Sequence, residues 1–226
     1  MFKPFYTGTF LELLNPFALL CGVLSVLMLA MHGALFLNLK MTDSLQKRAI
    51  TAARISAIAV IVIFTLGGIW IYYGIDGYQL NSILPHDGPS NPLQKLVIQE
   101  VGAWFFNYHL LPASLLLPVM GIGGALVALF TTRWVCVAFF SSALCVAGII
   151  GTVGVSMFPF ILPSSSHPEQ SLLVWDSSSS QLTLFIMLIA TVLFLPLILA
   201  YTAWVYRVLR GKVTSKTVKD NQDFAY

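Results

Sequence analysis

His32 is the residue in this sequence best placed to bind a haem or a metal ion within an apolar stretch. An imidazole at that depth could be an axial ligand of haem iron. A haem would need a second strong ligand at similar depth, and Met28, Met31 or a partner chain could supply it. A single histidine on an apolar helix is more often a hydrogen-bonded packing residue, so we expect no haem ligand in this chain. The remaining histidines lie in loops without metal-ligand spacing: His86, His109 and His167.

Asp76 and Glu100 are the acidic residues best placed to exchange protons. Asp76 follows the second apolar stretch, and Glu100 borders the apolar face of a predicted surface helix. Carboxyl groups near a low-dielectric boundary tend to have perturbed proton affinities, so both could belong to a proton route. The alternative is that they cap helices and anchor loops, and the sequence alone favours this second interpretation.

No other pattern in the sequence supports catalysis. It contains no glycine-rich phosphate loop, no serine–histidine–aspartate set and no paired carboxylates. No basic patch is interleaved with aromatic residues, which argues against nucleic-acid binding. Cys21, Cys136 and Cys145 lie in apolar stretches without CxxC spacing, so we expect small core residues rather than metal ligands or disulfides.

The composition is that of a membrane protein. Hydrophobic residues make up 58% of the 226 residues and charged residues only 9%, against roughly 45–50% and 25% in soluble domains. So few charges cannot cover the surface of a water-soluble globule of this size. Lipid must therefore replace much of the solvent.

Five apolar stretches are long enough to cross a bilayer, which needs about 20 residues of helix. The sequence therefore predicts an all-α integral membrane protein. The predicted spans cover approximately residues 17–39, 55–73, 113–130, 135–158 and 182–206. We expect a four-helix bundle with one further helix preceding it.

The charges between the spans predict the orientation of the chain. Basic residues cluster after the first span, between the third and fourth, and after the fifth, whereas the other connectors are nearly free of them. Such segments remain on the cytoplasmic side. Residues 1–16 are therefore expected outside, residues 17–207 form the transmembrane domain, and residues 208–226 form a cytoplasmic tail.

The long outer connector is expected to contain a short amphipathic helix over about residues 92–107. Asn91 and Pro92 form a good helix start. Beyond them, apolar residues from Leu93 to Tyr108 recur on one helical face, with Lys95 and Gln99 opposite. Such a helix would lie on the membrane surface or against the bundle.

Small residues at four-residue spacing predict where helices pack closely. These helix-packing candidates are Gly121 and Ala125 in the third span and Ala143, Ala147 and Gly151 in the fourth. Pro196 lies within the fifth span and should kink it.

Six stretches of the sequence resemble subunit II of the bacterial cytochrome bd-type quinol oxidases, in the order of that family. They are residues 15–22 (NPFALLCG), 68–78 (GIWIYYGIDGY), 102–107 (GAWFFN), 157–164 (MFPFILPS), 175–184 (WDSSSSQLTL) and 201–204 (YTAW). The GIDGY and MFPF elements are the most specific of these.

The resemblance implies a place in the aerobic respiratory chain, in the bacterial inner membrane. In that family the complex oxidises ubiquinol or menaquinol and reduces dioxygen to water. Haem b and haem d are expected in the partner, subunit I. Subunit II stabilises that chain and is non-catalytic, so this chain alone should be inactive. The other expected partners are membrane lipid and a small single-span accessory subunit.

The predicted span count differs from that of the family, whose subunit II has eight spans. The resemblance begins near the family's fourth span, which implies that this chain corresponds to the C-terminal part of the subunit. The proton-route acids of the family's earlier helices therefore cannot be assigned to any residue here.

Two other classes of protein fit the composition. A small multi-span transporter usually has a polar or broken helix near the bilayer midplane, for which His32 and Pro196 are the only indications. A membrane scaffold or assembly protein without a redox role would use the small-residue faces to bind a partner.

The predicted orientation can be tested with Asp87→Cys and Lys216→Cys variants in intact cells. We expect a membrane-impermeant maleimide to label the first from outside and the second only in opened cells, because they lie in base-poor and basic segments respectively. The unmodified chain gives the background from its own cysteines. The reverse pattern would contradict the orientation.

Overall fold

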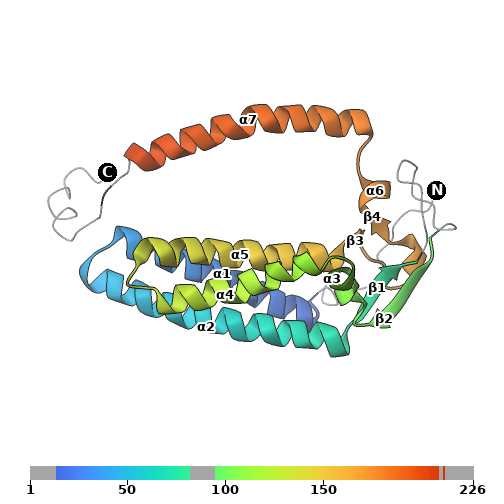
Figure 1. The fold of residues 1–226 in the computed structure, drawn as a ribbon, viewed down its shortest axis with the longest axis horizontal. Coiled ribbons are helices and arrows are strands. Elements are labelled where there is room, and N and C mark those ends of the chain that lie inside the picture. The colour runs from blue at the N-terminus through green and yellow to red at the C-terminus, as the bar shows by residue number, and fades with distance from the viewer. Residues whose placement is uncertain (1–13, 82–94, 209–210, 212–226) are drawn as a thin grey trace. The chain divides into compact units, whose positions relative to one another are not determined.

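The computed structural model describes residues 14–81, 95–208 and 211 (Figure 1). The chain divides into two compact units. The first contains Met1–Gly77 and Glu100–Ser156, and the second contains Tyr78–Gln99 and Met157–Tyr226. Each unit is described by itself.

Five helices of the described residues are long and apolar enough to cross a membrane, which confirms the predicted number of spans. Four belong to the first unit and the last to the second. They are α1 (Pro16–Lys40), α2 (Asp43–Gly74), α4 (Leu116–Phe130, extended by the 3₁₀ turn η4, Pro112–Leu115), α5 (Val135–Met157) and α7 (Gln181–Val208).

α1 and α2 show why helix limits and span limits differ. Asn15 caps α1, since its Oδ1 accepts a hydrogen bond from the Ala18 amide at 2.7 Å, and Pro16 occupies the first turn. α2 begins twelve residues before the predicted span of 55–73. Residues 43–54 include three Ala, one Gln, one Lys and two Arg, all of which favour helix, but the charged ones interrupt the apolar pattern. Hydropathy therefore located the apolar part of α2 and not its first three turns.

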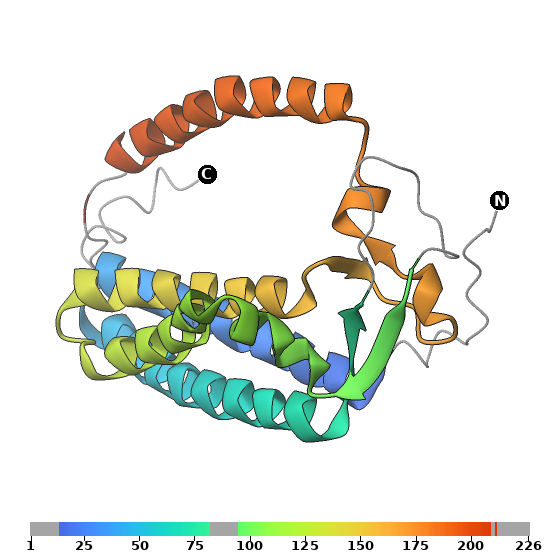
Figure 2. The same ribbon diagram turned by 45° about the vertical axis from the view of Figure 1, so that its right-hand side comes forward.

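α1, α2, α4 and α5 lie side by side and share one hydrophobic core (Figures 1 and 2). Met31 and Leu35 of α1 are almost fully buried in it, as are Val60 of α2 and Ala125 of α4. The first helix is thus part of the bundle, which corrects the expectation that it only precedes one. One side of α1, which includes Met28, Met31 and Leu35, packs into this core, a pairing that composition could not reveal.

α4 and α5 approach each other closely because glycines line their contact. A Cβ atom on Gly124 would lie 2.6 Å from the Ser141 carbonyl oxygen, and one on Gly148 would lie 2.5 Å from the Gly121 amide nitrogen. Cβ atoms essentially never approach backbone so closely, so only glycine allows this packing. In lipid the hydrophobic effect does not favour helix association, so dispersion contacts between the two backbones stabilise the pair instead.

The expected helix over residues 92–107 is wrong for the residues that the structure describes. Val97–Val101 form strand β2, which pairs with β1 (Asp76–Leu80). The predicted helix start at Asn91 and Pro92 lies outside the described residues. Three of the five residues of β2 are β-branched, and Gly102 ends the strand with φ +83°. Helical structure follows only as a 3₁₀ turn, η3 (Ala103–Phe105), and as α3 (Phe106–Leu110).

The second unit contains a two-stranded antiparallel sheet and the last apolar helix. β3 (Phe160–Leu162) pairs with β4 (Leu172–Leu173), with Phe160 opposite Leu173. A 3₁₀ turn, η5 (Pro168–Gln170), precedes β4, and α6 (Val174–Ser177) follows it. No residue of α7 is buried. Pro196 lies inside α7, whose axis curves in both views (Figures 1 and 2).

The glycine contact between α4 and α5 makes a specific stability prediction. Gly148→Ala should lower the free energy of unfolding by about 1–3 kcal/mol, because the added methyl group meets backbone atoms that cannot turn away. Thermal or denaturant unfolding in detergent would measure the change. Gly154→Ala, in the same helix with nothing within 4 Å of the added atom, is the matched control and should be neutral or stabilising. Equal losses in both variants would contradict the packing.

Candidate functional site

His32 on α1 is held by two residues of α5. Its Nδ1 lies 2.8 Å from the Ser142 hydroxyl oxygen, and that hydroxyl lies 2.7 Å from the Phe139 carbonyl oxygen, to which it donates. Because the serine proton is used there, Nδ1 carries the imidazole proton and donates to Ser142. The ring also stacks on Phe139, with centroids 4.6 Å apart. These contacts use one ring nitrogen and one ring face, and the packing role expected of His32 stays a prediction.

A buried polar network joins the other end of α1 to the turn between α4 and α5. Asn38, which is fully buried, donates from Nδ2 to the Thr132 carbonyl oxygen at 3.0 Å. Gln46 donates to the Asn38 side-chain oxygen at 3.1 Å, and Arg54 Nη2 donates to the Thr132 hydroxyl oxygen at 2.9 Å. Buried polar groups are costly unless hydrogen-bonded. The network therefore holds the connection between α1 and α2 against the connection between α4 and α5.

At the opposite end of the bundle, α3 caps the last turns of α5. Asn107 Nδ2 donates to the Val155 carbonyl oxygen at 2.7 Å. The Tyr108 hydroxyl donates to the Thr152 carbonyl oxygen at 3.1 Å and also lies 3.1 Å from the Ser156 hydroxyl. The last four carbonyl groups of a helix lack partners within it. Val155 is one of these, so α3 supplies a bond that α5 cannot make itself.

Two stretches that resemble the oxidase family contact each other in the first unit. A Cβ atom on Gly77 would lie 2.4 Å from the Trp104 amide nitrogen and 2.9 Å from the Ala103 carbonyl carbon. Gly102 has φ +83°, and a Cβ atom on it would lie 3.7 Å from the Tyr72 carbonyl oxygen. The GIDGY and GAWFFN elements therefore contact each other through their backbones.

In the second unit, Tyr78 of the GIDGY element contacts Phe160 of the MFPF element. The rings of Tyr78 and Phe160 are 5.9 Å apart, and Phe160 and Leu173 are both buried. Lys95 is only 4% exposed and donates from Nζ to the Ser171 carbonyl oxygen at 2.8 Å. A buried lysine is rare unless its ammonium group is hydrogen-bonded. The segment before β2 is thereby fixed to the segment before β4.

Asp76 and Glu100 lie at exposed positions of the paired strands β1 and β2. Within the described parts of the chain, neither carboxylate has a hydrogen bond or an ion pair. Their loop-anchoring role and their part in a proton route both stay predictions.

Of the predicted helix-packing residues, Gly121 and Ala125 lie buried at the contact of α4 with α5. Gly151 is half-buried, and a Cβ atom there would lie 2.8 Å from a methyl group of Leu117. Ala143 and Ala147 are exposed on the other face of α5. The residues of α5 that do pack inward are Ala138, Ser142, Cys145, Gly148 and Ile149.

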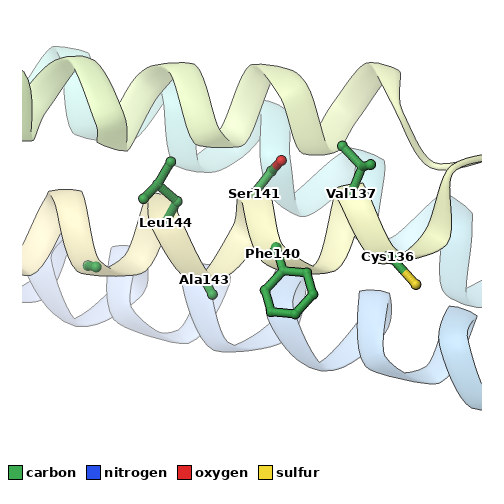
Figure 3. Close-up of a pocket in the computed structure, with 7 residues that line it drawn as sticks. Cys136, Val137, Phe140, Ser141, Ala143 and Leu144 are labelled. Atoms are coloured by element: carbon green, nitrogen blue, oxygen red, sulfur yellow. The ribbon is translucent and has the colours of Figure 1, made fainter.

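The exposed face of α5 carries an open groove of about 700 Å³ (Figure 3). Phe140 and Ala143 point to one side of α5 in this view, and Val137 and Leu144 to the other. The residues that line the groove are Cys136, Val137, Phe140, Ser141, Ala143, Leu144 and Ala147. Except for one hydroxyl and one thiol, these side chains offer only apolar contacts, which suits a helix or a lipid chain rather than a polar substrate.

The metal-ligating residue types are dispersed. Among the described residues, no three of His, Cys, Asp and Glu come together as a metal site would require. His109 and His167 are exposed, and His86 lies outside the described residues. Cys145 is buried in the bundle core, whereas Cys21 and Cys136 are exposed on the helix surface. Only Cys145 is therefore the core residue that we predicted for all three.

Comparison with known families gives a match over most of the chain. The family model described as cytochrome bd terminal oxidase subunit II matches residues 1–209. The chain belongs to the cytochrome bd terminal oxidase subunit II family. The resemblance inferred from the six stretches is thereby confirmed.

Individual relatives agree with this assignment. The chain is 48% identical over 223 residues to a probable cytochrome oxidase subunit 2 of Haemophilus influenzae, covering 98% of this chain and 59% of the relative. It is 42% identical over 227 residues to the cytochrome bd-I ubiquinol oxidase subunit 2 of Escherichia coli K12, with the same coverage. A Bacillus subtilis cytochrome bd ubiquinol oxidase subunit 2 is 24% identical over 216 residues, 91% of this chain and 53% of the relative. The chain thus spans somewhat more than half the length of these curated relatives.

Sequence reasoning missed most polar contacts of this family member. Asn38 was detectable as a carboxamide within an apolar stretch, where an unpaired polar group is costly. Lys95 was predicted on the polar face of a surface helix, but it is buried. Nothing in the sequence indicated that Thr132 and Ser142 are the partners of residues about a hundred positions away.

The buried network can be tested by Asn38→Ala. We expect a loss of about 1–2 kcal/mol in the free energy of unfolding, because the variant leaves the Gln46 amide and the Thr132 carbonyl without their bonds to Asn38. Thr51→Ala removes only a bond from an exposed hydroxyl to its own helix and should change stability by less than about 0.5 kcal/mol. Unfolding in detergent compares the two. A neutral Asn38→Ala variant would show that the network is not stabilising.

Proposed function

We propose that this chain acts as a non-catalytic membrane subunit of a cytochrome bd-type quinol oxidase. In this role it packs against the haem-bearing subunit I, while the complex oxidises quinol and reduces dioxygen to water. Membership in the subunit II family supports the proposal, as does the name of the Escherichia coli relative, a ubiquinol oxidase subunit.

The observation that carries the proposal is the way in which the bundle uses its polar residues. His32 is bonded to Ser142, and Asn38 to Thr132 and Gln46. These groups are directed to one another inside the first unit rather than to a shared ligand. Such a bundle can pack beside a neighbouring redox subunit. As the family resemblance implies, we assign haem b and haem d to subunit I.

The exposed face of α5 is the proposed contact with that subunit. Ala143 and Ala147 are one turn apart on this face, and small residues at this spacing let a second helix approach closely. Phe140 lies beside them and is 71% exposed. Its ring would pack between side chains of the partner.

The proposed location is the bacterial inner membrane, with the N-terminal end outside. The two strands that carry Asp76 and Glu100 then lie on the outer side. From exposed positions there, both carboxylates could exchange protons with water, which is what the end of a proton route requires.

The proposal can be tested by co-expressing the tagged chain with a cytochrome bd subunit I and purifying it through the tag. We expect a haem-bearing chain to copurify, with the absorption bands of haem b and haem d in the eluate. A transporter would bind a solute without a haem partner, and a general scaffold would recover other membrane proteins in its place. Either outcome would contradict the oxidase role.

The contact face has its own test in the same purification. Ala147→Phe should reduce the recovered haem by about thirtyfold, since an overpacked helix contact costs about 2 kcal/mol. Ala30→Phe on α1, where Ala30 is exposed, adds the same bulk on another helix and should leave recovery unchanged. If both variants retained full haem recovery, subunit I would not contact this face of α5.

A further inference from the structure

We propose that the bundle binds the phosphate group of an anionic phospholipid at the end where α1 turns into α2 and α4 turns into α5. The residues that would bind it are Lys47, Arg54 and Arg133, which we call the basic patch. This inference depends on the membrane-spanning fold and is independent of the oxidase role.

The hydrogen-bond network brings the basic patch together from two distant segments. Lys47 and Arg54 are seven residues apart on α2, which places them on the same face about 10 Å apart. Arg133 directly follows Thr132, whose hydroxyl accepts the 2.9 Å hydrogen bond from Arg54. Thr132 is itself 1% exposed and is held by Asn38. Arg54 is therefore fixed beside the turn that carries Arg133.

The charges of the basic patch are not neutralised within the part of the chain that the structure describes. All three side chains are exposed, and no carboxylate there forms an ion pair with them. Asp43, at the start of α2, instead accepts a hydrogen bond from the Thr42 hydroxyl at 3.0 Å. Arg54 uses one of its five N–H groups on Thr132. The others can form the paired bonds that guanidinium makes with phosphate.

The surroundings of the basic patch favour a phospholipid over a free phosphate ion. Trp134, next to Arg133, is 71% exposed, and tryptophan prefers the headgroup level of a bilayer. Beyond Arg54, Ile58 and Val62 continue along the same face of α2 and are 51% and 48% exposed. A phosphate at the basic patch would therefore have an apolar helix surface beneath it for its acyl chain.

The test is a titration of the purified 226-residue chain in detergent with a fluorescent short-chain phosphatidylglycerol. We expect saturable binding that is tighter than binding of the matching phosphatidylcholine and that weakens as salt is added. Arg54→Gln with Arg133→Gln should weaken binding by about 25-fold, or roughly fivefold for each charge removed near the membrane surface. Arg207→Gln removes an exposed base at the end of α7 and should leave the affinity unchanged.

A second variant distinguishes a binding site with a positioned arginine from a general attraction between opposite charges. Thr132→Val keeps every charge and the shape of the side chain, but removes the acceptor that positions Arg54. We expect about threefold weaker binding of phosphatidylglycerol if that one bond is worth the usual fraction of a kcal/mol. Circular dichroism and gel filtration would establish that each variant is folded.

Four results would overturn the proposal. The first is equal binding of phosphatidylcholine, and the second is an equal loss of affinity in Arg207→Gln. The third is full competition by inorganic phosphate at the same concentration, which would identify a phosphate site without lipid preference. Unchanged affinity in Thr132→Val would likewise show that Arg54 is not a positioned ligand.

Discussion

Every polar group within the lipid-embedded part of this chain must find its partner inside the protein, and this constraint governs the bundle. Water cannot solvate such groups in the hydrocarbon, so each unpaired one is costly. Asn38 and Ser142, both fully buried, meet the requirement by bonding across helices. Those bonds also fix which helices are neighbours. The polar residues therefore help to specify the arrangement of the helices.

Close packing provides the second contribution, and glycine makes it possible. In lipid the helices gain nothing from hiding apolar side chains, since the surroundings are equally apolar. Gly124 and Gly148 let the backbones of α4 and α5 meet directly. Gly77 serves the same purpose against the Ala103–Trp104 turn. The stretches by which the family was recognised thus contain contacts that larger residues would prevent.

The sequence predicted the spans well because their signal is composition over about 20 residues, which does not depend on the partners of any residue. It failed where the choice depended on contacts. Val97 and Val101 fit a helical face by spacing, but their β-branched shape and Gly102 suit the strand that is formed. In α5, two sets of small residues share the same period. Nothing in the sequence distinguishes the inward Gly148 from the outward Ala147, because both faces of a membrane helix are apolar.

The polar partners were beyond prediction for a related reason. Thr132 and Ser142 are ordinary residues by sequence, and they matter because the fold brings Arg54 and His32 within 3 Å of them. Family membership identified the kind of protein without naming these contacts. The assignment of the chain and the detail of its packing therefore come from independent sources.

The unequal lengths of the helices determine how the bundle would respond to the thickness of its bilayer. At 32 residues, α2 is about 48 Å long, well beyond a hydrocarbon layer of about 30 Å. Its apolar part begins only after Arg54, which is tied to a buried threonine. In a thinner membrane, sliding α2 along its axis would break the hydrogen bond between Arg54 and Thr132. Tilting the whole bundle leaves every internal bond intact and is the less costly adjustment.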